Sequence, residues 1–418
     1  MTTTKELIIR THHVERVQTV GGDSLEPTDR QTGRPSHPIM LVKCHKSLPP
    51  LLKHTDVPAR ITENFILSGY RFPNYSLVQC LVSAFRPTNE TGNFWTHFLP
   101  VFVFGFYFAE PFGWEGAAPA NDPFFYPLWT YFIGVFCLLT ASSMAHLLNS
   151  MSLVVREVCF FVDYGTISAY TVGSSLAYHY YIHPRAGIPE LGAGGANDSR
   201  EHPLAAPEAP GFGVFFETFY IPSSCLVAVI CVLACCNTRQ RWRTYRYVIR
   251  TLVFLLPFLV ASTPIFYRLL HASPSSPSYD SSFPAAQFFY RHCFWLVASA
   301  VFNISKVPER LSPGRFDIWG HSHQWFHVCT FLSILDELHM INGELRAILL
   351  RLAPGGTPTA PPHLPGPTMA STYGVMLLLQ ASIASIIAWF SWCAKVVYEP
   401  QAGQAGKEVL AKRHLKCH

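Results

Sequence analysis

Hydrophobic and polar positions along the chain fall into long apolar runs separated by polar connections. Each run has few charged residues and approaches the roughly 20 residues of helix that a bilayer requires. This pattern predicts an all-α polytopic membrane protein, a seven-helix bundle followed by an eighth helix. The predicted spans are Phe94–Ala109, Tyr126–Asn149, Val158–Ile182, Gly213–Cys236, Thr251–Tyr267, Ala286–Ser305, Gln324–Ile341 and Tyr373–Cys393.

The segments between these spans give the domain organisation. Residues 1–93 form an N-terminal region that is expected to be disordered to about residue 54. Within it, residues 76–86 place Leu77, Cys80, Leu81 and Ala84 at helical spacing, which predicts an amphipathic helix on the inner membrane interface or packed on the bundle. Residues 94–341 are the seven-helix core, 342–372 a Pro/Gly-rich linker, 373–397 the eighth helix and 398–418 a basic tail.

Composition and charge agree with a membrane protein and exclude one class of partner. Charged residues make up 14% of the chain, against roughly 25% in ordinary globular proteins. The net charge of +5 is too small for a nucleic-acid-binding protein. Lys and Arg gather before the first span, on the even-numbered connections and in the tail. The positive-inside rule therefore predicts a cytoplasmic N-terminus. We expect a multi-pass protein of the cell membrane, with the endoplasmic reticulum as a further location.

A few ionisable residues within the spans are candidates for function, because such groups are costly in a bilayer unless they are paired or bound. His323 and His327 stand at i and i+4 on one helix face. With His146 as a third ligand, they predict a zinc site with a position left open for water. Asp163 is expected to orient or deprotonate that water, and Ser142, one turn before His146, to support the site.

The same residues also fit an interpretation without metal, in which polar side chains hydrogen-bond between helices. Their spacing alone does not decide between the two interpretations. His321 would point to another helix face and is expected to lie at the membrane interface. Glu90, Asn93 and His97 share one face of a helix start, and we expect them to cap that helix and tie it to its neighbours.

Several sequence blocks, taken together, resemble a known family. They are Glu90-x2-Asn93-x3-His97, Ser142-x3-His146, DYGTIS from Asp163 and HSHQWFH from His321. In this order they resemble the signature blocks of the progestin and adipoQ receptor family, over about Glu63 to Ile341. Three features resemble the membrane progestin receptor branch more than the adiponectin receptors: the segments FFVDYGTIS and KVPERLSPGRFDIWGHSHQ, and the eighth span. Two segments are most similar to the epsilon-type member of that branch, YGTISAYTVGSSLAYHYY and SKVPER.

The resemblance implies a seven-helix fold with its N-terminus inside the cell. It also implies a zinc ion held by His146, His323 and His327, with Asp163 near the metal-bound water. The progestin branch implies a receptor for steroids, progesterone and neurosteroids among them, with rapid non-genomic signalling through heterotrimeric G proteins. The adiponectin receptors and alkaline ceramidases imply instead a zinc-dependent hydrolase of ceramide-like amides.

Three functional hypotheses follow, since one fold can host several functions. The first is a steroid receptor that takes a lipophilic ligand from the membrane, and the second is the zinc hydrolase, with Asp163 as water orienter or base. The third is an interaction protein that keeps the fold without ligand or turnover. We favour the receptor, because the branch-level resemblance is closest there and no further nucleophile or base motif accompanies the histidines.

Overall fold

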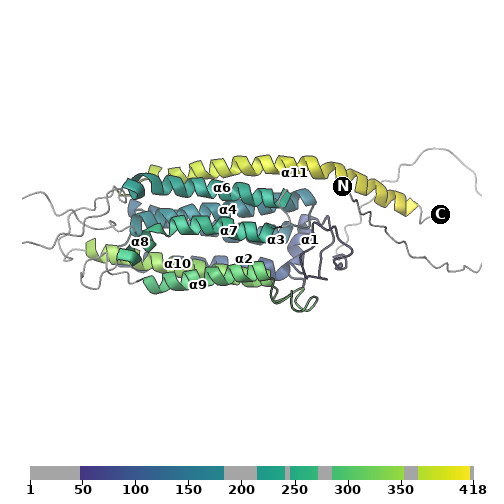
Figure 1. Cartoon of the computed structure of the whole chain (residues 1–418), viewed down its shortest axis with the longest axis horizontal. Coiled ribbons are helices and arrows are strands. Elements are labelled where there is room, and N and C mark those ends of the chain that lie inside the picture. Colours follow the sequence, from purple (N-terminus) through teal and green to yellow (C-terminus); the bar gives the residue numbers. More distant parts are fainter. Residues whose placement is uncertain (1–47, 183–213, 241–244, 272–284, 353–365, 415–418) are drawn as a thin grey trace, which may run out of the picture. The chain divides into compact units, whose positions relative to one another are not determined.

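The computed structural model describes residues 48–182, 214–240, 245–271, 285–352 and 366–414. Across these ranges the chain forms no strand, although Leu52 and Tyr70 make an isolated antiparallel bridge. Long helices run side by side (Figure 1). They are α2 (Thr91–Phe108), α3 (Tyr126–Leu148), α4 (Leu153–Tyr181), α6 (Tyr220–Gln240), α7 (Arg246–Ala261), α8 (Thr263–His271), α9 (Ala286–Ser305), α10 (Ser322–Leu352) and α11 (Val375–His414).

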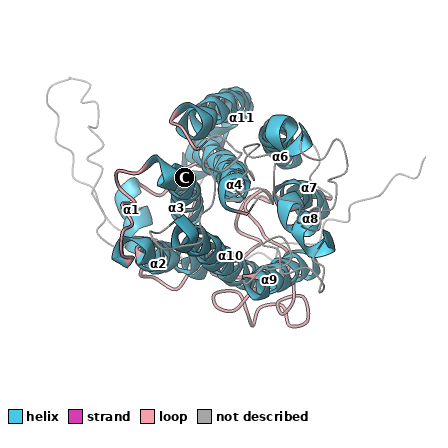
Figure 2. Ribbon diagram, turned by 90° about the vertical axis from the view of Figure 1, so that its left-hand side faces the viewer, coloured by secondary structure: helices cyan, strands magenta, loops and turns pink. Residues whose placement is uncertain are grey.

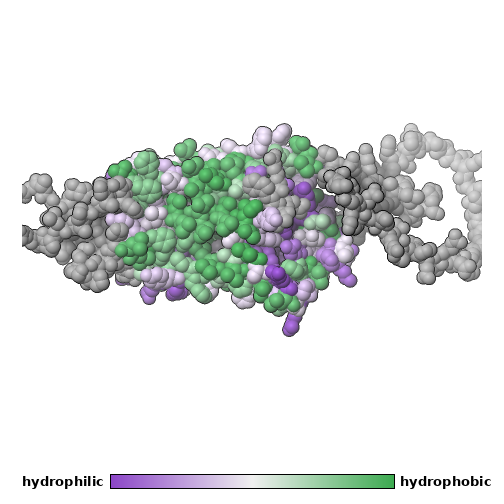
Figure 3. Space-filling model, in the orientation of Figure 1, coloured by the Kyte–Doolittle hydropathy of each residue, from purple (hydrophilic) through white to green (hydrophobic). Residues whose placement is uncertain are grey.

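Each predicted span coincides with one of these helices or with the α7–α8 pair, so the predicted fold class is confirmed. By length and composition, the helical segments Pro123–Leu148, Phe215–Gln240 and Ala370–Glu399 suffice to cross a membrane. Helices α7 and α8 pass the same test together, with a bend of 57° between them. Figure 3 shows apolar side chains gathered over the middle of the helices and polar ones toward the end that carries α1 (Leu77–Ser83). The chain is a multi-pass membrane protein.

Helices α10 and α11 extend furthest beyond their predicted spans. Helix α10 continues to Leu352 and α11 to His414, so the described part of the predicted linker 342–372 is largely helical, and the eighth helix runs past residue 397. Hydropathy predicts where a helix leaves the lipid, but the helix itself continues until a helix-breaking residue. In α10 no proline occurs after Ser322 until Pro354. Residues 353–365 and most of the segment predicted to be disordered lie outside the described residues.

The short amphipathic helix predicted before the first span is present as α1. Ser76 accepts a hydrogen bond from the Gln79 backbone, and the Gln79 side chain accepts one from the Ser76 backbone, which satisfies the free N–H groups of the helix start. Cys80 packs against the bundle, whereas Leu81 and Phe85 are exposed. One face of α1 therefore packs on protein. Its other face is apolar and exposed, and we still expect that face to contact lipid.

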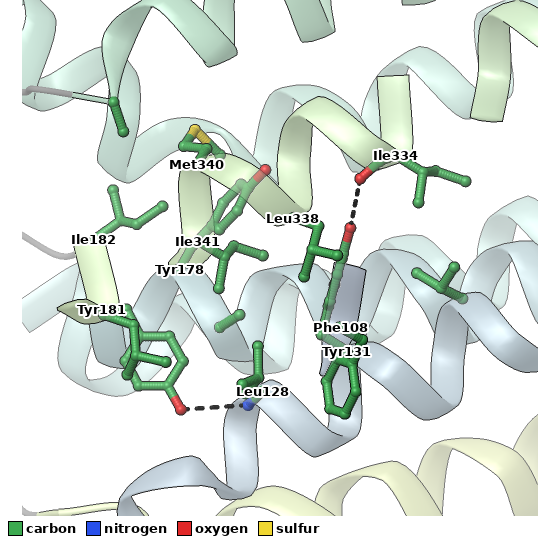
Figure 4. Packing of buried hydrophobic residues seen from close by; sticks show 14 of the residues in the cluster. Phe108, Leu128, Tyr131, Tyr178, Tyr181, Ile182, Ile334, Leu338, Met340 and Ile341 are labelled. Atoms are coloured by element: carbon green, nitrogen blue, oxygen red, sulfur yellow. Dashed lines mark hydrogen bonds between the residues drawn. The ribbon is translucent and has the colours of Figure 1, made fainter. Parts of the chain in front are cut away.

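Helix α4 lies at the centre of the bundle, where it packs against α3, α6, α7, α10 and α11 (Figure 2). Glycines permit the close approach of α3 and α4: a Cβ atom at Gly173 would lie 2.9 Å from the Thr130 carbonyl oxygen. Aromatic side chains fill the adjoining core (Figure 4), where the Tyr131 hydroxyl donates a hydrogen bond of 3.0 Å to the Ile334 carbonyl. Interhelical contacts of this kind fix α3, α4 and α10 relative to one another.

The segment before α1 is anchored to the bundle by the buried guanidinium of Arg71. It donates to the carbonyls of His146 and Leu147, both at 2.6 Å, and to the side chains of Asn149 at 2.7 Å and Ser83 at 3.0 Å. The two carbonyls belong to the last turn of α3, where helical partners are missing and a positive charge is favourable. Arg71 thereby closes the end of α3 and fixes the backbone of His146.

A second contact joins the same segment to the connection between α9 and α10. The Asp317 carboxylate accepts hydrogen bonds from the Leu67 backbone at 3.0 Å and from the Ser68 hydroxyl at 2.6 Å. Residues far apart in sequence are thus held at the α1 end of the bundle.

The substitution Arg71→Leu is expected to lower the melting temperature of the detergent-solubilised protein by about 5 °C or more, because it leaves buried carbonyl groups without donors. Arg310→Leu, which changes an exposed arginine, should melt like the parent. Thermal unfolding followed by intrinsic fluorescence measures both. Equal melting temperatures for Arg71→Leu and the parent would show that the anchor contributes little.

Candidate functional site

The three histidines predicted as metal ligands meet between α3 and α10. One possible ligand atom from each of His146, His323 and His327 can be chosen so that all lie within 4.8 Å of one another. The Nε2 atoms of His146 and His323 are 3.3 Å apart, and the ring centroids of His323 and His327 are 4.5 Å apart. The predicted juxtaposition is therefore present, and His146 and His327 are buried.

Hydrogen bonds behind the rings set the tautomers of two of these histidines. Nδ1 of His146 lies 2.7 Å from the Glu90 carboxylate, which accepts its proton. The Thr96 hydroxyl donates to the Asn93 carbonyl at 3.1 Å, so it accepts from Nδ1 of His327 at 3.0 Å. Both rings then carry a lone pair on Nε2. This is the arrangement by which outer hydrogen bonds orient metal-binding histidines.

Glu90 fulfils half of its predicted role: it ties the start of α2 to the end of α3, but it does not cap α2. It makes no side-chain capping bond at the start of α2, and its carboxylate accepts instead from His146 and from the amides of Asn93 and Asn149, each at 2.8 Å. Burial raises the pKa of Glu90, but the adjacent imidazole of His146 and nearby guanidinium groups lower it more, so the net pKa is below its ordinary value. The capping prediction for Glu90 is wrong, because the carboxylate is turned toward α3.

Two other histidines make contacts that the sequence did not predict. His97 stacks on His327 with 3.8 Å between ring centroids, and neither of its nitrogens has a hydrogen-bond partner among the described residues. It therefore joins the imidazole cluster without forming the predicted polar ties. His321 is buried, with its Nε2 3.2 Å from the Asn89 carbonyl oxygen, so it packs against the segment before α2, and its position at the membrane interface stays a prediction. The connection before α10 folds back over the bundle and covers it.

A cavity of about 550 Å³ opens beside the histidines. This volume falls in the range of small-molecule sites, roughly 300 to 1,000 Å³. Its walls are mostly apolar, with contributions from Leu138, Phe254, Phe258 and Leu296. Asp163 and Ser142, the other predicted site residues, also line it.

The side chains of Asp163 and Ser142 form no hydrogen bond to another described residue. Their oxygen atoms are therefore free to serve a ligand or a water in the cavity. A further polar group at the cavity wall, which the sequence did not mark as a site, is Glu337. Its carboxylate accepts hydrogen bonds from the hydroxyls of Tyr170 and Tyr178, the latter at 2.7 Å.

The donor set fits a divalent metal ion. The Nε2 atoms of His146 and His323 lie within hydrogen-bond distance of each other, and a cation between the rings would replace that contact by ligand bonds to three imidazoles. Three protein nitrogens would leave a further coordination position for a water or a ligand.

Comparisons with known proteins agree with this fold. The family model described as "Haemolysin-III related" (HlyIII) matches residues 85–336. Membrane progestin receptor delta of Mus musculus is 32% identical over 301 residues, 71% of this chain and 80% of that protein. Membrane progestin receptor delta of Homo sapiens is 31% identical over 347 residues, which are 82% of this chain and 91% of that protein. Membrane progestin receptor gamma of Homo sapiens is 32% identical over 307 residues, which are 72% of this chain and 82% of that protein.

The matched region contains all five predicted site residues and α2 to α9 together with the first half of α10. It also contains Glu90 and Thr96, which orient two of the histidines. The chain therefore belongs to the haemolysin-III-related family, which includes the progestin and adipoQ receptors.

Proposed function

We propose that this chain is a multi-pass plasma-membrane receptor for steroids of the progestin and neurosteroid type. The observation that carries the proposal is the cavity of about 550 Å³ within the helices, with mostly apolar walls and polar groups at separate places. A steroid has a rigid apolar skeleton with oxygen atoms near its ends, which matches this distribution. The similarity to proteins called membrane progestin receptors supports the same ligand class.

One face of α4 forms a continuous wall of the cavity. Asp163, Ile167, Tyr170, Ser174 and Tyr178 all line it, at the spacing of a single helix face. Asp163 and Tyr170 are about two turns apart, roughly 10 Å along the axis. A steroid skeleton lying along α4 would therefore have polar partners at both ends and apolar contacts between them.

We further infer that His146, His323 and His327 hold a zinc ion. Nitrogen ligands in threes are typical of zinc, and the hydrogen bonds that His146 and His327 donate to Glu90 and Thr96 leave Nε2 lone pairs for it. Such an ion would link α3 to α10 beside the cavity, so its free energy of binding would also stabilise the fold.

The proposal includes an orientation and a route for the response. The distribution of Lys and Arg supports a cytoplasmic N-terminus and places the α1 end of the bundle inside the cell. Ligand-dependent movement of helices around the cavity would then reach the basic connections on that side, where heterotrimeric G proteins are the proposed partners. Membrane lipid is the source from which the ligand enters.

Membranes from cells that express this chain are expected to bind radiolabelled progesterone saturably and competably, above membranes from the same cells without it. His327→Ala should weaken binding roughly tenfold or more and lower the melting temperature, because both depend on the metal-linked helices. His339→Ala, on the same helix but outside the cavity lining, is the matched control. Binding and melting of His327→Ala like the parent would refute this role for the metal, and absence of specific binding despite confirmed expression would refute the receptor.

A second candidate function is favoured by the free carboxylate of Asp163 in the cavity. A zinc-bound water and a carboxylate that orients it or accepts its proton are the groups needed to hydrolyse an amide. The hydrolase hypothesis predicts release of fatty acid from ceramide by the purified protein, lost on removal of zinc and in Asp163→Asn. Activity that survives Asp163→Asn would remove Asp163 from the mechanism, and an inactive parent would eliminate the hydrolase.

A further inference from the structure

Four cationic side chains line the cavity where it meets the α1 end of the bundle, and two of them form ion pairs with Glu63. Arg156 comes from α4, Arg246 and Arg250 from α7, and Lys306 from the end of α9, and all four line the cavity. We call them the cation cluster. Glu63, from the segment before α1, forms ion pairs of 3.4 Å with Arg246 and 3.7 Å with Arg156.

Two cluster members, Lys306 and Arg250, make no ion pair or hydrogen bond with a carboxylate in the described chain, although Glu63 and Glu309 act electrostatically on Lys306 and Asp163 on Arg250. Lys306 is 8% exposed, and its ammonium lies 3.7 Å from the centre of the Tyr247 ring without a hydrogen bond to any described residue. Arg250 donates from Nε to the Thr238 hydroxyl at 2.8 Å, and its two terminal nitrogens have no partner among the described residues. Both therefore keep N–H groups that an additional acceptor would satisfy.

Arg156 has the same deficit although it is buried. It is 3% exposed, its Nε has no hydrogen-bond partner within the described chain, and its guanidinium packs 5.4 Å from the Phe160 ring centre. Arg239, by contrast, is bound to Glu157 through two hydrogen bonds of 2.7 and 3.1 Å. The fold therefore supplies a dedicated carboxylate to a neighbouring arginine and leaves the cation cluster with a surplus of positive charge.

Without a bound anion, the surplus positive charge of the cation cluster raises the free energy of the folded protein. Buried charges require partners, and a cation that lacks one is destabilised by desolvation. Burial lowers the pKa of Lys306 to about 8, although Glu63 and Glu309 act to raise it. Glu309 is itself occupied, since it accepts from the backbone N–H of Ser322 at 2.7 Å and from the hydroxyl of the same residue.

We propose that the cation cluster binds the anionic group of an amphiphilic ligand, a sulfate, phosphate or carboxylate, whose apolar body fills the cavity. Guanidinium and ammonium groups are the usual partners of such anions. Arg156 precedes Asp163 by about two turns of α4, roughly 10 Å, so the anion lies at one end and the apolar body runs past Ile167. The inference rests on the proposed function, because it narrows the ligand class of the same cavity.

Glu63 is the internal competitor in this arrangement. Its carboxylate takes part of the charge of the cluster, but its side chain is 41% exposed, so a ligand anion can share or displace it. The Tyr247 hydroxyl also donates to Glu63 at 2.8 Å. An amide at this position would keep an acceptor for Tyr247 while removing the negative charge.

The test measures binding of matched probes to the full-length protein in a non-ionic detergent. The probes are pregnenolone sulfate and pregnenolone, hexadecyl phosphate and hexadecanol, and sodium sulfate. The anionic member of at least one pair should bind at least tenfold more tightly than its neutral counterpart, and sodium sulfate should bind far more weakly than either ester. Steroid and single-chain lipid sources are thereby distinguished.

Variants test the cluster through the ratio of the two affinities, which a partial loss of folded protein leaves unchanged. Arg250→Gln and Lys306→Gln should bring the ratio of anionic to neutral affinity close to one. Arg310→Gln removes an exposed cation close in sequence and should keep the parental ratio. Glu63→Gln should raise the ratio several-fold, because the internal competitor is gone.

The outcomes distinguish a failure of the anion site from a failure of the proposed receptor function. Equal binding of the anionic and neutral members of both probe pairs in the parent, or an unchanged ratio in both Arg250→Gln and Lys306→Gln, would overturn the inference, while saturable pregnenolone binding would still support the receptor. Sodium sulfate binding as tightly as the esters would also overturn it. Cluster-dependent binding of hexadecyl phosphate without steroid binding would support the anion site and reject the steroid receptor.

Discussion

The meeting of imidazole nitrogens between α3 and α10 is the constraint on which the candidate site depends. Hydrogen bonds from His146 to Glu90 and from His327 to Thr96 fix the rings from behind and leave Nε2 lone pairs directed inward. Without a metal, the Nε2 atoms of His146 and His323 pair with each other at 3.3 Å. In the proposed account a metal ion takes the place of that contact, and the hydrogen bonds behind the rings serve as its outer shell.

The α1 end of the bundle is built to hold that shell in place. Arg71 binds the carbonyl of His146, and Asp317 holds the backbone at Leu67 and the side chain of Ser68. These bonds connect the segment before α1 with the end of α3 and with the connection before α10. The segment before α1 and the connection before α10 thus support the three histidines. The segment before α1 also brings Glu63 to the cation cluster.

The apolar walls and the polar groups of the cavity have different consequences for a ligand. Apolar contacts along α4 favour a lipophilic body without selecting strongly among shapes, whereas unpaired polar groups reject ligands that leave them unsatisfied. The histidines, Asp163 and the cation cluster would therefore determine the selectivity of the proposed site. In this account the metal, the steroid skeleton and an anionic group are bound by neighbouring parts of one cavity.

Much of this arrangement could be predicted from the sequence, because its causes are local. Apolar runs gave the helices, and i, i+4 spacing placed His323 and His327 on one face of α10. The remaining features depend on tertiary structure. Glu90 was predicted to cap α2, since a helix start permits that, but its proximity to His146 arises only when α2 packs on α3. His321 is buried because a connection folds back over it, which no local pattern indicates.

X-ray absorption at the zinc edge of the purified, full-length protein tests the central claim most directly. The account predicts about one zinc ion per chain with three imidazole nitrogens at roughly 2.0 to 2.1 Å and a further oxygen ligand. Protein that is free of zinc yet folds and melts normally would contradict it. So would a spectrum dominated by sulfur ligands at roughly 2.3 Å, because the cluster contains no cysteine.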